Sequence, residues 1–249
     1  MIKSERERQI INILIQNGGF VTVQQLCEKL YASPSSIRRD LSRLENSGNV
    51  KRSYGGAELI RSFSGSIPFN YRYTLNEKAK KIIAEKAVTL IKENSVVFLD
   101  QSSSAFYVAN LLPNSRQLTV VTNNIEIISL LSQTNVNVIS SGGVLCNENR
   151  SCLIGQGAEN TFSKIHADLA VISSKSLSKS GVISDCAHDE LPVKSAMINN
   201  ASKVAYLCDG SKIGSFSPYI QCDLSKIDYL ISDVQCSSFK KLFPHLTVL

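Results

Sequence analysis

The apolar positions of residues 1–57 recur with the spacing of three short helices. Apolar residues at i, i+3, i+4 and i+7 indicate an amphipathic helix, and this spacing covers residues 10–14, 23–30 and 37–44. Thr22 and Gln25 stand three residues apart, as in a capping box, where the second helix would begin. Ser33 and Pro34 supply an N-cap and a proline at the first helical position of the third helix. The pattern therefore predicts three helices with a tight turn between the last two.

The third helix has an apolar side and a polar side, and a strand-like segment follows it. Ile37, Leu41 and Leu44 form the apolar stripe, and hydroxyl and arginine side chains occupy the opposite face. Residues 49–57 alternate and then turn on a glycine pair, which predicts a β-hairpin. A helix-turn-helix at about residues 20–39 with a basic hairpin behind it is typical of a winged helix-turn-helix that binds DNA. The alternative is a helical bundle that docks a protein.

Hydroxyl and cationic side chains of this segment are the candidates for contact with DNA. Arginine side chains on the third helix can reach base edges in the major groove. Lys51 and Arg52 of the hairpin can bind phosphate, and so can hydroxyl-bearing helix N-termini. The candidate DNA-binding residues are Thr22, Ser33, Ser35, Ser36, Arg38, Arg39, Ser42, Arg43, Lys51 and Arg52.

Strand-like and helical stretches alternate in the rest of the chain. The strand-like runs are residues 96–100, 118–122, 136–140, 169–173, 204–209 and 229–233. Apolar runs of this length separated by helices imply a parallel sheet that is covered on both faces. The predicted fold class is therefore an α/β doubly wound, mostly parallel sheet that follows a mainly α winged helix-turn-helix.

A helix and a linker are predicted ahead of this sheet. Asn76 is expected to cap a long helix. The broad apolar face of that helix would contain Ala79, Ile82, Ile83, Ala87, Leu90 and Ile91. Residues 58–73 lack periodicity. The predicted organisation is a DNA-binding domain at residues 1–57, a linker at 58–73 and a second domain at 74–249.

Polar residues follow nearly every predicted strand. In a doubly wound sheet, ligands bind outside the carboxyl ends of the strands. The loops there begin with Asp100, Thr122, Gly142, Ser173 and Asp209. Hydroxyls and backbone N–H groups at a helix start suit phosphate, and a glycine pair lets backbone approach a ligand. Five such loops on one edge favour a small, anionic, polyhydroxy ligand over a solvated rim.

Glu190 and Lys194 are spaced one helical turn apart, ahead of the fifth predicted strand. A carboxylate and an ammonium at i and i+4 contribute either to a ligand site or to a surface salt bridge. The sequence leaves both possibilities open.

The segment SIRRDLSRLENSGNVKRSYGGA, residues 36–57, resembles the N-terminal signature of the DeoR family of bacterial transcription regulators. That family pairs a winged helix-turn-helix with a sugar-phosphate sensor domain related to ribose-phosphate isomerases. Residues 37–41 and the Gly-Gly-Ala at 55–57 match it well. Tyr54 stands where the family usually has His, and Ser36 where Thr is usual. We expect these two changes to alter which operator is read.

The resemblance extends through the second domain and implies an effector site there. Two motifs depart from the family's pattern. The family's Asp-x-Gly-Thr-Thr is here Asp100 to Ser104 without the Gly, and its Gly-Ala-Asp-Gly is here Ser174 to Leu177, which exchanges a carboxylate for Lys175. We expect a changed ligand rather than a lost one. The candidate effector-binding residues are Asp100, Ser102, Ser103, Ser104, Thr122, Asn123, Gly142, Gly143, Lys175, Glu190, Lys194, Asp209 and Lys212.

Composition and charge exclude several other classes of protein. The 249 residues carry a net charge of +6, and residues 1–60 hold nine Lys and Arg against six Asp and Glu, so the N-terminal quarter is the basic part. Seven Cys without a CxxC pair and three scattered His support neither a disulfide framework nor a metal site. No apolar run approaches the length of a membrane span, and the charged start lacks a signal-peptide core. A cytoplasmic protein without cofactor, metal or membrane partner is expected.

The resulting prediction is a sequence-specific transcription regulator rather than an enzyme. We expect a repressor of a carbohydrate-metabolism operon that binds double-stranded operator DNA as a homo-oligomer, a dimer or a tetramer, and is relieved by a phosphorylated sugar or related metabolite. One alternative is a sugar-phosphate isomerase, which needs a carboxylate base and a cation to steady the enediolate. A second is a DNA-binding protein whose second domain binds no ligand. No catalytic residue is predicted.

Overall fold

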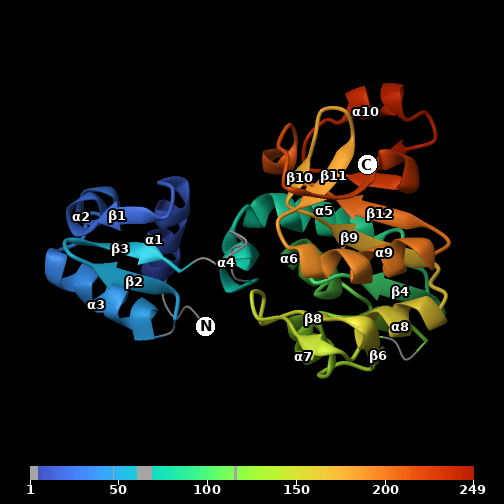
Figure 1. Cartoon of the computed structure of the whole chain (residues 1–249), viewed down its shortest axis with the longest axis horizontal. Helices are drawn as coiled ribbons and strands as arrows, with labels where there is room; N and C mark the ends of the chain where they lie inside the picture. Colours follow the sequence, from blue (N-terminus) through green and yellow to red (C-terminus); the bar gives the residue numbers. More distant parts are fainter. Residues whose placement is uncertain (1–4, 47, 61–68, 115–116) are drawn as a thin grey trace. The chain divides into compact units, whose positions relative to one another are not determined.

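The chain forms two compact units, Met1–Leu75 and Asn76–Leu249, each with a hydrophobic core of its own (Figure 1). The computed structural model describes residues 5–46, 48–60, 69–114 and 117–249. The elements of the N-terminal unit are, in chain order, α1 (Glu5–Gln16), β1 (Phe20–Thr22), α2 (Val23–Leu30), α3 (Pro34–Asn46), β2 (Val50–Ser53), β3 (Gly56–Leu59) and α4 (Phe69–Thr74).

The three predicted helices and the hairpin are confirmed in this unit. Strand β2 pairs with β3 in antiparallel register, and the two-residue turn is Tyr54-Gly55, with Gly55 at a φ of +79°. Strand β1 was not predicted, and it pairs with the other edge of β3. Gly56 permits this pairing, because a Cβ there would lie 2.5 Å from the carbonyl oxygen of Val21. The result is a three-stranded sheet, ordered β1-β3-β2, against three helices.

Ordered elements overlap both ends of the predicted linker. Strand β3 runs to Leu59, which is buried in the core of the N-terminal unit. Helix α4 begins at Phe69, and Tyr71 belongs to the same core. The middle of the predicted linker, residues 61–68, lies outside the described residues. The domain limits at 57 and 74 remain a prediction.

The Thr22→Ala variant is expected to lower the free energy of unfolding of the N-terminal unit by about 1 kcal/mol. Thr22 Oγ1 accepts a hydrogen bond from the backbone N–H of Gln25, and the Gln25 side chain accepts one from the Thr22 N–H, so both halves of the capping box form. Loss of the hydroxyl leaves the N–H of Gln25 without this partner. Urea unfolding measures the change. Gln24→Ala, on the exposed side of the same turn, is the control, and an equal effect there would contradict the capping role.

The elements of the C-terminal unit alternate between helices and strands. They are α5 (Glu77–Val88), β4 (Val96–Leu99), α6 (Ser103–Ala109), β5 (Thr119–Thr122), α7 (Ile125–Leu131), β6 (Asn137–Ser140), β7 (Val144–Leu145), β8 (Leu153–Ile154), α8 (Gln156–Lys164), β9 (Leu169–Ser173), β10 (Ser176–Leu177), β11 (Val182–Asp185), η1 (His188–Glu190), α9 (Leu191–Asn199), β12 (Val204–Leu207), η2 (Gly210–Lys212), β13 (Tyr219–Asp223), η3 (Leu224–Lys226), β14 (Tyr229–Ile231), α10 (Ser237–Leu242) and β15 (Thr247–Val248).

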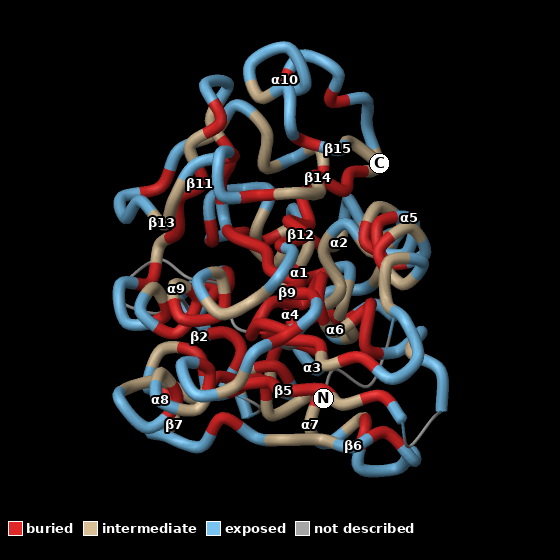
Figure 2. The backbone as a smooth tube through the Cα atoms, turned by 90° about the vertical axis from the view of Figure 1, so that its right-hand side faces the viewer, coloured by how far each residue is buried: buried red, intermediate tan, exposed pale blue. Residues whose placement is uncertain are grey.

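Seven of these strands form a parallel sheet in the order β15-β14-β12-β9-β4-β5-β6. Six of them are the predicted strands, and β15 is an unpredicted addition at one edge. Helices α5, α6 and α7 cover one face of the sheet, and α8 and α9 cover the other (Figure 1). Figure 2 shows the central strands in the colour of buried residues. The predicted doubly wound α/β class is therefore confirmed.

The first helix of this unit differs from its prediction in two ways. Asn76 has a left-handed backbone, with φ at +52°, and makes no cap hydrogen bond, because a capping residue needs an extended backbone to aim its side chain at the first turn. Its side chain donates instead to Asp209 Oδ1 and Ser211 Oγ. Ile82 of the expected apolar face is 43% exposed, whereas Lys80 is buried.

Two smaller sheets lie outside the predicted set. Strands β10, β11 and β13 form an antiparallel sheet, and β7 pairs with β8 in a hairpin. The hairpin holds the loop of residues 146–152, and β11 ends at Asp185. Both places contribute to the site described below.

Candidate functional site

The outer face of α3 carries unpaired cations. Ile37, Leu41 and Leu44 are buried in the core of the N-terminal unit, which turns the opposite side of the helix outward. Arg38 and Arg39 are exposed on that helix, as Lys51 is on β2. Within the described part of the chain, these three side chains have no hydrogen-bond or ion-pair partner. They are the predicted DNA-binding residues that the fold leaves available for a partner.

Other predicted DNA-binding residues are held by the unit itself. Arg43 forms ion pairs with Glu7 of α1 and Asp40 of α3. Arg52 donates to Ser42 Oγ at 2.9 Å and lies 3.9 Å from a Glu45 oxygen, which ties the hairpin to α3.

The hydroxyls at the helix starts are also engaged. Thr22 caps α2, as described above. Ser33 Oγ accepts from the N–H of Ser36 and lies 3.0 Å from the hydroxyls of Ser35 and Ser36, as expected of a residue that caps α3. These residues shape the start of each helix.

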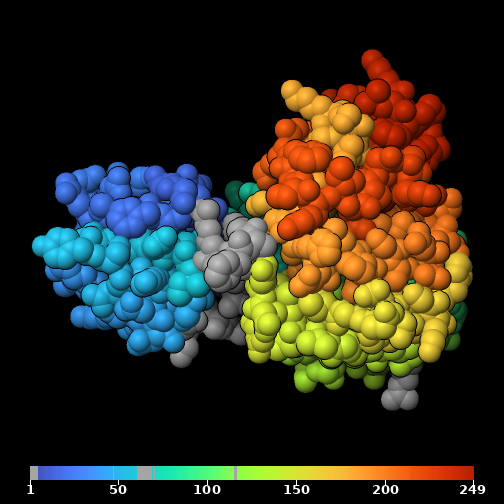
Figure 3. Space-filling model, viewed as in Figure 1, coloured from blue at the N-terminus to red at the C-terminus, as the bar shows by residue number. Residues whose placement is uncertain are grey.

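A groove lies between α2, α3 and the turn of the hairpin. Its volume is about 420 Å³, and it is lined by Val23, Gln24, Cys27, Pro34, Arg38, Leu41, Arg52, Ser53, Gly55 and Gly56. On the surface, α3 adjoins the β2–β3 hairpin, in light blue (Figure 3). Tyr54 at the tip of the hairpin is fully exposed. It was not among the candidate DNA-binding residues, although it stands where the family usually has His. A concave, Arg-lined surface of this kind suits a phosphodiester backbone.

The C-terminal unit brings charged side chains together where the direction of the sheet reverses. The chain runs from β4 outward through β5 and β6, and then returns to place β9 on the other side of β4. Asp100, directly after β4, accepts a hydrogen bond from the N–H of Ser173 at the end of β9, at 2.8 Å. The site therefore bridges the switch point, where ligands of such sheets bind.

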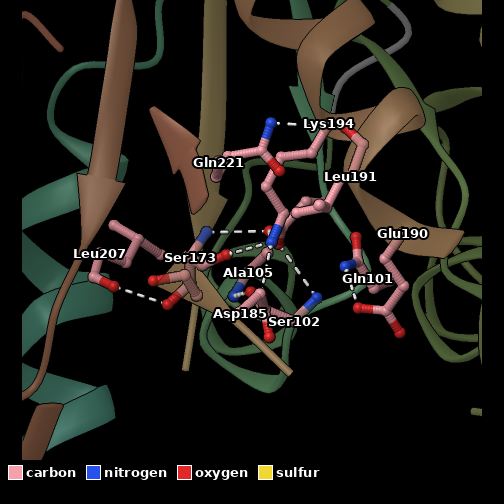
Figure 4. A network of polar contacts seen from close by, with 12 residues as sticks. Gln101, Ser102, Ala105, Ser173, Asp185, Glu190, Leu191, Lys194, Leu207 and Gln221 are labelled. Atoms are coloured by element: carbon pink, nitrogen blue, oxygen red, sulfur yellow. Dashed lines mark hydrogen bonds and ion pairs between the residues drawn. The ribbon is translucent and has the colours of Figure 1, made fainter. Parts of the chain in front are cut away.

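Lys194 of α9 is the central cation of this site (Figure 4). Its ammonium donates to the Ser173 carbonyl at 2.7 Å and to Asp185 Oδ2 at 3.0 Å, and it lies 3.8 Å from Asp100 Oδ2. The side chain is 1% exposed. Burial alone would lower the pKa of Lys194, but the carboxylates of Asp185, Asp100 and Glu190 more than offset this and raise it above its ordinary value.

Lys212 supplies a second cation at the same edge. It donates to Ser173 Oγ at 2.7 Å and lies 3.6 Å from Asp209 Oδ2. Burial acts to raise the pKa of Asp209, but the Lys212 ammonium and the hydrogen bonds from Ser211 outweigh it, so the pKa lies below its usual value. The loop that begins at Asp209 is thus linked through Ser173 to the loop that begins at Asp100.

Glu190 lies on the other side of Lys194, at the end of η1. Its two oxygens accept hydrogen bonds from Gln101 Nε2 at 2.6 Å and Asn149 Nδ2 at 2.9 Å (Figure 4 shows the contact with Gln101). Glu190 and Lys194 are both buried, and no ion pair joins them to one another. They are therefore not a surface salt bridge.

Some predicted effector residues support the loops. Ser102 Oγ caps α6 by accepting from the N–H of Ala105, and Thr122 Oγ1 donates to the Leu99 carbonyl. Asn123 Nδ2 donates to the carbonyl of Leu153.

The remaining candidates fall into three groups. Ser103 and Ser104 are buried in the first turn of α6. Gly143 approaches protein backbone, since a Cβ there would lie 2.5 Å from the Ile154 carbonyl oxygen, whereas Gly142 faces open space. Lys175 is exposed after β9.

Three residues of the site were not predicted: Gln101, Asn149 and Asp185. Asp185 had only a weak signal, since Ser184 separates it from the two apolar residues Val182 and Ile183, whereas Asp100 and Asp209 directly follow apolar runs. Gln101 directly follows Asp100 but was not among the candidate effector-binding residues. Asn149 lies in the loop of residues 146–152, where no sequence pattern marks it.

The described residues contain neither a metal-binding cluster nor a membrane-spanning helix. Among residues 5–46, 48–60, 69–114 and 117–249, no group of three or more His, Cys, Asp or Glu is placed to hold a metal ion. No helix formed by those residues has the length and apolar character needed to cross a membrane.

Known proteins resemble this chain over most of its length. It is 36% identical over 234 residues, 94% of this chain and 91% of the relative, to the HTH-type transcriptional regulator GolR of Listeria innocua. It is 28% identical to the glycerol-3-phosphate regulon repressor of Escherichia coli, over 94% and 92% of the two chains. A solved structure, ribose 5-phosphate isomerase A of Methanocaldococcus jannaschii, matches 55% of each chain with 17% identity and a TM-score of 0.42.

The family comparison agrees with the two units. The DeoR-like helix-turn-helix domain matches residues 6–63, and the DeoR C-terminal sensor domain matches residues 75–234. The names of the relatives support a DNA-binding regulator over the isomerase-like enzyme. With an exposed arginine face on α3 in the first matched region and a buried charged site at the sheet edge of the second, the chain belongs to the DeoR family of helix-turn-helix transcriptional regulators.

Proposed function

We propose that this protein represses a carbohydrate-metabolism operon by binding its operator through α3 and the β2–β3 hairpin, and that a phosphorylated sugar relieves the repression. The observation that carries the proposal is the combination, in one chain, of Arg38 and Arg39 on the outer face of a helix-turn-helix with a charged site at the switch point of a parallel sheet. The name of the Escherichia coli relative, a repressor of a glycerol-3-phosphate regulon, supports both parts.

The proposed contacts divide into base readout and positioning. Arg38 and Arg39 would enter the major groove, where arginine binds guanine through two hydrogen bonds. Lys51 and the groove beside Arg52 would hold the phosphodiester backbone, which fixes the register without reading the sequence. The exposed Tyr54 places an aromatic ring where the hairpin meets the DNA.

The sensor unit would act by shifting a conformational equilibrium. A ligand changes the DNA affinity only if it binds one arrangement of the protein more tightly than the other. Lys212 and the hydroxyls around it are the proposed contacts for the phosphate, and the carboxylate and amide side chains are those for the sugar.

We also propose a homo-oligomer, a dimer or a tetramer. One recognition helix and one hairpin contact too few base pairs for operator specificity, and two modules on half-sites one or more helical turns apart supply the rest. Sedimentation velocity at the concentration used for DNA binding measures the state. A monomer that binds its operator with full specificity would contradict this part.

The experiment that tests the proposal is a competition assay on promoter DNA. The purified protein is bound to DNA that flanks its own gene, at fixed salt, with random DNA as competitor and with a panel of sugar phosphates. Retention on the promoter that one compound releases is the expected result. A protein that never prefers a promoter, or that isomerises a sugar phosphate, would overturn the proposal.

The Lys212→Ala variant is expected to keep its operator affinity and to need at least about tenfold more effector for release, because a hydrogen bond from an ammonium to a phosphate is lost. Release of DNA at increasing effector concentration measures the change. Lys226→Ala is the matched control, since Lys226 ends η3 as Lys212 ends η2 but is exposed. An unchanged response in Lys212→Ala would place the effector elsewhere.

A further inference from the structure

Glu190 is a buried carboxylate that forms no ion pair with the described residues. It is 5% exposed, and the side chains that bind it, Gln101 and Asn149, are neutral amides. No Lys, Arg or His nitrogen of the described residues lies within 4.0 Å of its oxygens. Lys194, one turn further along, directs its ammonium to Asp185 and the Ser173 carbonyl instead. Burial of a carboxylate is costly unless a cation or several donors compensate it.

The amides around Glu190 leave hydrogen-bond acceptors unused. Gln101 Oε1 and Asn149 Oδ1 are buried and have no hydrogen-bond partner among the described residues, and the same holds for Asn123 Oδ1. Gln101 and Asn149 are 2% and 3% exposed, so bulk water does not bind these atoms. Each buried acceptor that lacks a donor destabilises the protein. Asn124 Nδ2 is a buried donor that likewise has no partner among the described residues.

Negative side chains outnumber positive ones at this edge of the sheet. Lys212 is matched by Asp209, and Lys194 faces the two carboxylates of Asp100 and Asp185. Glu190 adds a third negative charge near Lys194, so one ammonium serves three carboxylates and Glu190 has no ion pair of its own within the described residues. The Glu190 side of the site therefore has more negative than positive charge and two buried acceptors without donors from the described part of the chain. The described His, Cys, Asp and Glu residues do not form a group that would hold a metal ion.

We infer that Glu190, Gln101 and Asn149 bind an ammonium group of the effector, so that the effector is a phosphorylated sugar that carries a primary amine. This inference rests on the proposed function and specifies its ligand. The ammonium binds the Glu190 carboxylate beside the two amide N–H groups that it already accepts from, since a carboxylate has about four acceptor sites. Lys212 remains the proposed contact for the phosphate.

The number of donors distinguishes an amine from a hydroxyl at this place. An ammonium has three N–H donors, which match the Glu190 carboxylate, Gln101 Oε1 and Asn149 Oδ1. A hydroxyl has one donor and no charge, so it leaves two acceptors unsatisfied and the carboxylate uncompensated. A hydrogen bond between two charged groups is about twice as strong as one between neutral groups. We therefore expect an amino sugar phosphate to bind about 10- to 100-fold more tightly than the sugar phosphate with a hydroxyl at the same carbon.

Titration calorimetry on the full chain at neutral pH tests the inference with matched ligands. The probes are glucosamine 6-phosphate against glucose 6-phosphate, and galactosamine 6-phosphate against galactose 6-phosphate, each with its N-acetylated derivative. The expected result is preference for the amine in at least one pair, with the preference lost on acetylation, because the amide carries no charge. In Glu190→Gln the ratio of affinities within that pair is expected to fall to about one.

Glu148→Gln is the matched control, since it makes the same change on the loop that carries Asn149 without touching Glu190, and it should keep the preference. Hydroxyl members that bind as tightly as their amine partners in the wild-type protein would overturn the inference and leave the proposed sugar-phosphate effector in place. If no sugar phosphate of either kind binds to a protein that still retains operator DNA, both the inference and the proposed effector are overturned. The comparison between ligands on the wild-type chain decides the question even if Glu190→Gln does not fold.

Discussion

Replacement of Lys194 by methionine is expected to lower the free energy of unfolding of the C-terminal unit by about 3–5 kcal/mol, the loss usual when one member of a buried ion pair is removed. The ammonium joins Asp185, Asp100 and the Ser173 carbonyl, and methionine fills a similar volume with no donor. Asp100 and Asp185 then remain buried with their charges uncompensated. Urea unfolding at neutral pH, followed by circular dichroism, measures the shift.

The pH of that measurement follows from the pKa of Lys194. Because the pKa is raised in the folded protein, the contribution of the ammonium is present in full below the ordinary lysine value of about 10.4 and is lost only as the pH rises above it. Lys203→Met is the matched control, since the Lys203 ammonium pairs with Asp228 at the surface and its loss should change little. Equal unfolding midpoints for Lys194→Met and the wild type would contradict the central role of Lys194.

Replacement of Arg39 by alanine is expected to weaken operator binding by about 10- to 100-fold and to relax the preference for one base pair, because an arginine–guanine contact contributes about 1–3 kcal/mol of discrimination. Arg39 is exposed on the outer face of α3 and has no partner within the described residues, so its removal leaves the core of the N-terminal unit intact. Competition binding with operator variants measures both the affinity and the preference.

Two comparisons identify the kind of contact that Arg39 makes. Arg43→Ala removes the same side chain from a position whose guanidinium is paired with Glu7 and Asp40, so we expect a loss of stability with the base preference retained. If Arg39→Ala weakens binding to random DNA as much as to the operator, Arg39 contacts phosphate and does not read the sequence.

The fold was predictable where a local pattern carries the structure. Capping residues and apolar stripes specify α2 and α3 within a few residues of chain, and continuous apolar runs mark the six main parallel strands. Short strands such as β1 and β10 have no such pattern, because their pairing is decided by the strand beside them. Asn76 was placed correctly at a helix start, but its side chain binds Asp209, which lies 133 residues away, and no local pattern predicts that contact.

The candidate site was predictable in part for the same reason. Asp100, Asp209 and Lys212 follow strands whose ends must meet at one edge, so the topology alone brings them together. Asn149 comes from the β7–β8 hairpin, and its position beside Glu190 depends on how that hairpin packs. A ligand was expected to approach the backbone at Gly143, but the group that lies close to it is the backbone carbonyl of Ile154.

The hydrogen bond between Asp100 and Ser173 joins residues 73 positions apart, across the strands that meet at the switch point. Strands β4, β5 and β6 can associate early, since each follows the last along the chain, whereas the pairing of β4 with β9 must wait for a long loop to close. The contact between Asp100 and Ser173 forms only when that closure is complete. A ligand that binds this edge of the sheet in the folded protein alone would raise the free energy of unfolding in proportion to the logarithm of its concentration.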